Sequence, residues 1–219
     1  MSSPSSAPSP LAVLAQTRLL PAISPLDDAV VNAWADACVA SGVLALELLL
    51  RGEGAEPAAL GAIKRLTTSH PRLAVGVGTV FDAATAQRVC AAGARIVVSP
   101  VTDAPTGAVC AAAGVDWLPG AFTPTEIAFA ERSGATQVKL FPALAINAPA
   151  ATRGAISSRE TLVGMMREAA RVASTERRKA GAAGFGVGER LLSGADPRSA
   201  AAITERLRAA LVTAGGAAY

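Results

Sequence analysis

The chain has 219 residues, of which 51% are hydrophobic and 17% charged, and its formal net charge is +3. This composition is typical of a globular protein whose core is built from small apolar side chains. The basic residues are scattered and form no patch with aromatics, so we expect no nucleic-acid partner. No stretch has the uninterrupted apolar length of a membrane span, so we expect no membrane partner either.

Residues 1–17 begin with a Ser- and Pro-rich run that cannot bury apolar surface and that lacks the basic region of a signal peptide. We therefore expect a disordered tail over residues 1–17 and one folded domain over residues 18–219. Cys38, Cys90 and Cys110 form no CxxC pair and lie in Ala-rich stretches, where a free thiol behaves as a small hydrophobe. Free thiols favour a reducing, cytoplasmic location.

From residue 18 onward, short apolar runs alternate with longer helical patterns. The runs are bounded by Gly or Pro and are too short for buried helices, so they predict strands covered on both faces. Eight strands are expected, over residues 19–23, 43–49, 73–77, 94–98, 115–118, 137–141, 162–165 and 182–187.

The patterns between these runs predict seven helices, over residues 27–41, 56–69, 82–92, 104–113, 125–133, 167–180 and 197–214. Asp82 and Thr125 are the expected N-caps of two of them, because their side chains accept hydrogen bonds from the free N–H groups of a first turn. Four glycines stand directly after helices, where a left-handed residue is favoured: Gly42, Gly93, Gly114 and Gly134.

Evenly spaced strand–helix units with parallel strands imply right-handed crossovers. Eight such units predict an α/β fold, the (β/α)8 or TIM barrel, in a single domain. An open, doubly wound sheet is the alternative. In a barrel the chemistry lies where strands end and the following loops begin.

Lys139 is one of three lysines and lies between Val138 and Leu140 at the end of an expected strand. Burial disfavours the charged form of an amine, and a neutral lysine amine is the nucleophile that forms a Schiff base with a carbonyl. From the residues alone, a lysine that extends to solvent or pairs with a carboxylate is an equally good interpretation.

Glu47 interrupts an otherwise apolar run between Val43 and Leu50. A carboxylate in a buried strand needs a partner or a proton, which suits general acid–base chemistry. A structural ion pair with Arg51 is the alternative. Arg51 is also able to bind a substrate carboxylate through two hydrogen bonds, and the Thr79 hydroxyl is a further candidate ligand for such a group.

Together these segments resemble the 2-keto-3-deoxy-6-phosphogluconate (KDPG) and 4-hydroxy-2-oxoglutarate (KHG) aldolase family. The resemblance runs from about Leu19 to Gly188 and rests on five motifs in order. They are Glu47-x-x-x-Arg51, Gly76-x-Gly78-Thr79-Val80, Ser99-Pro100, Pro119-Gly120-x-x-Thr123-x-x-Glu126 and Lys139-x-Phe141-Pro142-Ala143.

This resemblance implies a class I aldolase, which cleaves a 2-keto acid to pyruvate and an aldehyde through a Schiff base on Lys139. Glu47 is then the group that moves protons. Arg51 and Thr79 bind the substrate carboxylate, while Pro100 and Phe141 shape the pocket. The protonated imine is the electron sink, so we expect no metal and no other cofactor. The family usually forms trimers, so a homotrimer is expected.

The resemblance fails where family members bind a phosphate, in the loops after strands seven and eight. The seventh reads Gly164-Met165-Met166-Arg167, and the eighth ends in Gly188-Glu189. We take Gly164, Arg167, Gly188 and Glu189 as contacts to the far end of the substrate. A carboxylate at residue 189 would repel a phosphate, so the sequence favours a substrate that is not phosphorylated.

Two other readings stay open. A barrel that binds a small ligand but has lost turnover is one, motivated by the altered loops. Another is a phosphate-binding barrel enzyme that resembles thiamine phosphate synthases or epimerases, which would have no need of Lys139 in its motif. The single histidine, His70, is expected to be a solvated loop residue.

Overall fold

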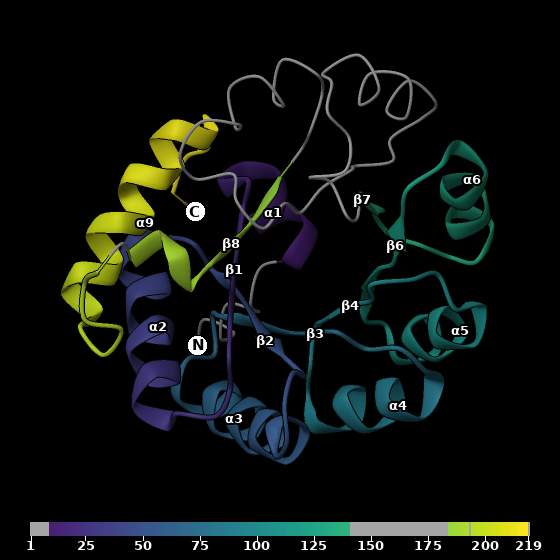
Figure 1. Ribbon diagram of the computed structural model, residues 1–219, viewed down its shortest axis with the longest axis horizontal. Helices are drawn as coiled ribbons and strands as arrows, with labels where there is room; N and C mark the ends of the chain where they lie inside the picture. Colours follow the sequence, from purple (N-terminus) through teal and green to yellow (C-terminus); the bar gives the residue numbers. More distant parts are fainter. Residues whose placement is uncertain (1–8, 141–183, 193, 219) are drawn as a thin grey trace, which may run out of the picture.

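Parallel strands with helices outside them form the part of the chain that the computed structural model describes, residues 9–140, 184–192 and 194–218 (Figure 1). The strands are β1 (Leu19–Ile23), β2 (Ala45–Leu49), β3 (Ala74–Gly78), β4 (Ile96–Val98), β5 (Asp116–Leu118), β6 (Gly120–Ala121), β7 (Lys139–Leu140) and β8 (Phe185–Gly188). The helices are α1 (Pro10–Thr17), α2 (Asp28–Ser41), α3 (Ala55–Ser69), α4 (Ala83–Ala92), α5 (Ala104–Ala113), α6 (Pro124–Arg132) and α9 (Ala200–Ala214), with a 3-10 helix, η2, at Glu189–Leu192. The expected α/β class is confirmed.

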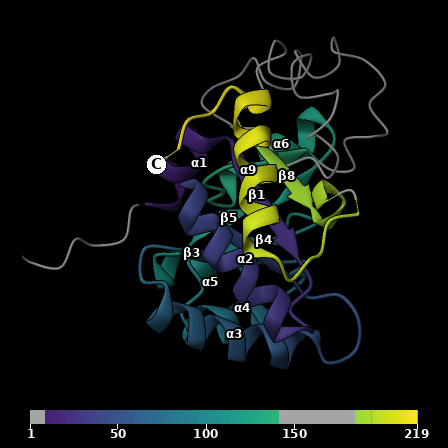
Figure 2. The same ribbon diagram turned by 90° about the vertical axis from the view of Figure 1, so that its left-hand side faces the viewer.

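The order of the strands distinguishes the two predicted architectures. Six parallel strands pair in the order β5-β4-β3-β2-β1-β8, and β6 pairs in parallel with β7. The last strand therefore lies beside the first, as in a barrel, whereas strand order reverses partway through a doubly wound sheet. Figure 1 shows the helices forming an outer ring, and α2 packs against α9, which Figure 2 views from the side. The strand expected at 162–165 and the helix expected at 167–180 lie outside the described residues.

Helix α1 corrects the predicted disordered tail. Residues 1–8 lie outside the described part, but Pro10–Thr17 are helical, so the expectation is wrong for them. The Ser/Pro composition was misleading, because the apolar residues that follow it, Val13 and Leu14, are both buried. They pack into an inner cluster with residues in or next to five strands, most of them where a strand begins: Leu20, Leu44, Ala45, Ala74 and Ile96, together with Val98 and Leu118. Helix α1 thus fills the N-terminal end of the barrel and leaves the opposite end for chemistry.

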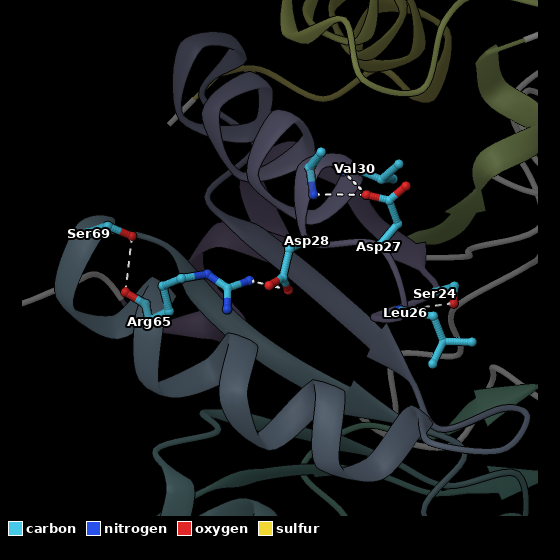
Figure 3. A network of polar contacts seen from close by, with 8 residues as sticks. Ser24, Leu26, Asp27, Asp28, Val30, Arg65 and Ser69 are labelled. Carbon is cyan, nitrogen blue, oxygen red and sulfur yellow. Dashed lines mark hydrogen bonds and ion pairs between the residues drawn. The ribbon is translucent and has the colours of Figure 1, made fainter.

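The helix ends follow the expected physics. Gly42, Gly93 and Gly114 end α2, α4 and α5 in the left-handed conformation, as predicted. The Asp27 carboxylate caps α2 by accepting from Ala29 and Val30, and Figure 3 shows this cap beside the ion pair of Asp28 with Arg65, 2.7 Å long, that joins α2 to α3. These contacts fix the helices that surround the strands.

The predicted cap at Thr125 is wrong, whereas the predicted cap at Asp82 is confirmed. Helix α6 begins at Pro124, and Thr123 is its N-cap. Thr123 accepts from the Glu126 N–H at 3.3 Å, and the Glu126 carboxylate accepts from the Thr123 N–H at 2.9 Å. This reciprocal capping box outweighs a single threonine cap two residues later, because it satisfies two free N–H groups.

Candidate functional site

Glu47 lies on β2 and faces the inside of the barrel. Ala45, two residues earlier on the same face of the strand, belongs to the inner cluster above α1. The register partners of Glu47 are Ala22 on β1 and Gly76 on β3, so both neighbours across the sheet are small. Only 2% of Glu47 is exposed, which confirms the expected burial of this carboxylate.

Lys139 begins β7 and is held there by the neighbouring strand. Its backbone N–H donates to the carbonyl of Pro119 at 2.8 Å, and it pairs in register with Gly120. Val138, the preceding residue, packs with Ile127 and Ala130 of α6 outside the barrel. Because successive side chains alternate between the two faces of a strand, Lys139 points inward. It is half-buried and stands on the same inner surface as Glu47.

The chain turns sharply toward this lysine at Pro119. Strand β5 pairs with β4, but the pairing ends at Leu118, and β6 then pairs with β7 instead. A β-carbon on Gly120 would overlap the carbonyl oxygen of Pro100, so only glycine allows this approach. The Thr102 hydroxyl donates to the Gly120 carbonyl at 3.1 Å. Pro100, expected from the sequence, therefore lies close to the strand pair that carries Lys139.

Ser99 and Trp117 fix the strand end before Pro100. The indole N–H of Trp117 donates to the Ser99 hydroxyl at 3.0 Å, and both residues are buried. Sequence reasoning missed this bond and the role of Gly120. The Pro-Gly pair was the available signal for the second, because this pair marks a turn.

Arg51 and Thr79 meet across the ends of β2 and β3. The guanidinium Nε of Arg51 donates to the Thr79 hydroxyl at 3.2 Å, and the Leu50 N–H donates to the Gly78 carbonyl at 2.9 Å. Thr79 has φ of 69°, in the left-handed region that branched residues rarely adopt. Such strain persists where the surroundings impose a conformation and is found most often at functional sites.

The remaining expected site residues stand at the edge of what is described. Phe141, Gly164 and Arg167 lie outside the described residues. Gly188 ends β8 in register with Ala22, and η2 begins at once with Glu189. Ala22 of β1 is thus the register partner of both Glu47 on β2 and Gly188 on β8. The contacts of Phe141, Gly164, Arg167 and Glu189 with the substrate stay predictions.

His70 corrects another expectation, because it is not a freely solvated residue. Its Nε2 lies 2.9 Å from the Asp36 carboxylate and its Nδ1 lies 2.8 Å from the Ser69 hydroxyl. This contact links α2 to the end of α3, far from the strand ends that carry Lys139. Among the described residues, no group of three or more His, Cys, Asp or Glu is arranged to hold a metal ion.

The family model for KDPG and KHG aldolases matches residues 11–159, more than half of the chain. The chain belongs to the KDPG and KHG aldolase family. This confirms the resemblance drawn from the five motifs. None of the helices in the described part of this family member has the length and apolar character needed to cross a membrane.

Known relatives agree with this assignment. The 2-dehydro-3-deoxy-phosphogluconate aldolase of Pseudomonas aeruginosa is 37% identical over 138 residues, which are 63% of this chain and 61% of that protein. The chain therefore spans less than two thirds of the length of this curated relative.

Solved structures extend the likeness to the whole fold. A 4-hydroxy-2-oxoglutarate/2-dehydro-3-deoxyphosphogluconate aldolase has 31% identity, a TM-score of 0.77, and covers 95% of this chain and 100% of its own. The KDPG aldolase of Legionella pneumophila was solved with pyruvate captured at low pH as a covalent carbinolamine intermediate. It has 22% identity and a TM-score of 0.74, and the match covers 93% of this chain and 98% of that protein. The TIM-barrel prediction is thus confirmed.

The strained backbone of Thr79 yields a direct test. Thr79→Ala and Thr79→Gly both remove the hydroxyl that Arg51 contacts, but only glycine adopts the left-handed region without cost. We expect the glycine variant to be the more stable by about 1 kcal/mol. Urea unfolding of the two variants measures this difference. An alanine variant as stable as the glycine variant would show that Thr79 is not strained.

Proposed function

We propose that this family member is a class I aldolase that reversibly cleaves a 2-keto-3-deoxy sugar acid or 4-hydroxy-2-oxoglutarate to pyruvate and an aldehyde. The observation that carries the proposal is that Lys139, the first residue of β7, and Glu47, in the middle of β2, both face the inside of the barrel. An amine and a buried carboxylate on one inner surface are what Schiff-base chemistry requires.

The reaction follows from these two groups. The Lys139 amine attacks the 2-keto carbon to form a carbinolamine, and once the carbinolamine hydroxyl has received a proton, loss of water leaves a protonated imine. Glu47 accepts the proton of the C4 hydroxyl as the C3–C4 bond breaks, and the electron pair of that bond moves into the imine to form an enamine. The aldehyde leaves, C3 receives a proton, and water hydrolyses the imine to release pyruvate and free Lys139.

The residues beside this pair orient the substrate. Arg51 and Thr79, joined at 3.2 Å at the ends of β2 and β3, are suited to hold the carboxylate next to the keto carbon. Pro100 lies close to the strand pair that carries Lys139, and by the family resemblance Pro100 and Phe141 are the residues that shape the pocket. The Legionella protein, which holds pyruvate as a covalent carbinolamine, is a precedent within the same fold for the first covalent step.

The substrate's far end is proposed to lack a phosphate. Gly188 ends β8 and Glu189 begins η2, while Gly164 and Arg167 are expected in the loop after the seventh strand. The negative charge of Glu189 opposes a phosphate, whereas Arg167 is suited to a second carboxylate. A non-phosphorylated sugar acid or 4-hydroxy-2-oxoglutarate therefore fits these residues better than KDPG does.

The proposal includes a homotrimer in the cytoplasm. Phe81, Val101 and Phe122 are exposed on three successive loops, after β3, β4 and β6, and Phe81 also lines an open hollow of about 250 Å³. These exposed apolar side chains are suited to burial between subunits, and the number of subunits follows from the family resemblance. The free thiols of Cys38, Cys90 and Cys110 suit a reducing compartment. Sedimentation as a monomer at working concentration would contradict the trimer.

Borohydride trapping tests the proposed imine. Pyruvate and borohydride are expected to leave one reduced pyruvyl adduct on Lys139, located by intact mass and peptide mapping, because borohydride reduces an imine to a stable amine. Lys139→Ala removes the adduct, while the matched change at the exposed lysine of α3, Lys64→Ala, leaves it unchanged. No adduct at saturating pyruvate would contradict the aldolase and favour a barrel that only binds a ligand.

Substrate preference tests the role of Glu189. We expect kcat/KM to be higher for the non-phosphorylated sugar acid than for its 6-phosphate. Glu189→Gln removes the charge at nearly constant size and is expected to raise kcat/KM for the phosphorylated substrate about tenfold, with little change for the other. Steady-state assays with both substrates measure this. Equal efficiency of the natural protein on the two substrates would contradict the proposed preference.

A further inference from the structure

The side chain of Glu47 occupies the space where a side chain of β3 would otherwise stand. A β-carbon placed on Gly78 would overlap Oε1 of Glu47 and would lie 2.6 Å from its Cδ and 3.0 Å from its Cγ. All three of the nearest atoms belong to this one carboxyl-bearing side chain. Glu47 therefore lies directly over the backbone of Gly78, two residues beyond its own register partner on β3.

The requirement at Gly78 is one of space and not of backbone conformation. Gly78 does not adopt the left-handed conformation, so its backbone is compatible with alanine. The other glycine on the same face of β3, Gly76, has different neighbours, because a β-carbon there would meet Ile96 with its Cβ at 2.9 Å. The two glycines thus accommodate different groups, Ile96 in one case and the Glu47 carboxylate in the other.

We propose that Gly78 is a positioning residue for the proton-transfer step, which sets where the Glu47 carboxylate lies relative to Lys139. The inference rests on the proposed function. Because the overlapping atoms are the far end of a side chain, a methyl group at residue 78 displaces Glu47 by rotation at little cost to β3. With only 2% of Glu47 exposed, the displaced carboxylate has few alternative places inside the barrel.

The consequence is specific to proton transfer. A displacement of a reacting group by about 1 Å costs on the order of a hundredfold in rate. We expect Gly78→Ala to lower kcat by about this factor, while KM and the end-point yield of the pyruvate adduct on Lys139 change little. A methyl group that merely loosened the barrel would instead lower the midpoint of urea unfolding and the yield of adduct together.

A double-mutant cycle tests the coupling to Glu47. Glu47→Gln is expected to lower kcat about a hundredfold or more, and Gly78→Ala combined with Glu47→Gln is expected to fall no further than Glu47→Gln alone. Gly76→Ala serves as the control for crowding inside the barrel, and its effect is expected to multiply with that of Glu47→Gln. Gly61→Ala, on α3 with nothing within 4 Å of the added carbon, is the control for substitution itself.

A crystal structure of Gly78→Ala separates this inference from the proposed function. The expected result is a rotated Glu47 side chain with the β3 backbone in place, and this outcome does not depend on any activity. Glu47 unmoved with β3 shifted, or multiplying losses in the cycle, would overturn the positioning role. Failure of the natural protein to form the pyruvate adduct would overturn the proposed function and leave the structural result standing.

Discussion

The burial of one carboxylate is the constraint on which this site depends. A carboxylate inside a barrel is costly unless its surroundings provide polar groups and space. Glu47 meets the steric part of that condition through its neighbours, because Ala22 and Gly76 flank it across the sheet and Gly78 has no side chain where the carboxyl group lies. The glycine at residue 78 of β3 is therefore explained by the acid on β2.

The two ends of the barrel differ because the chain fills one of them. Helix α1 places Val13 and Leu14 among the inner apolar side chains at the start of the strands. Toward the other end, the pairing of β4 with β5 stops before Pro119. Strand β6 then pairs with β7, whose first residue, Lys139, points into the barrel. Chemistry is thereby confined to one end, as in other barrels of this type.

Much of this architecture was predictable from the sequence. Even spacing of apolar runs predicted the barrel, and an acid within an apolar run predicted a buried Glu47. Glycines after the helices marked their ends, because a left-handed residue there has a local cause. The five motifs, in order along the chain, indicated the family.

The errors arose where one local signal hid a further contact, near or distant in the sequence. The Ser/Pro run concealed α1, whose stability comes from strands that follow it in the chain. Thr125 was chosen over Thr123 because the reciprocal bond of Glu126 was not weighed. In the sequence Gly78 is only part of a motif, and its contact with Glu47 depends on a register between β2 and β3 that composition does not specify.

The most direct test of the central claim is the exchange of the methyl protons of pyruvate with solvent deuterium, followed by proton NMR in D2O. Enamine formation requires both the imine on Lys139 and a base that removes a C3 proton. The account predicts exchange by the natural protein, none by Lys139→Ala, and exchange about a hundredfold slower in Glu47→Gln. Exchange at the natural rate in Glu47→Gln, or persisting in Lys139→Ala, would contradict the account.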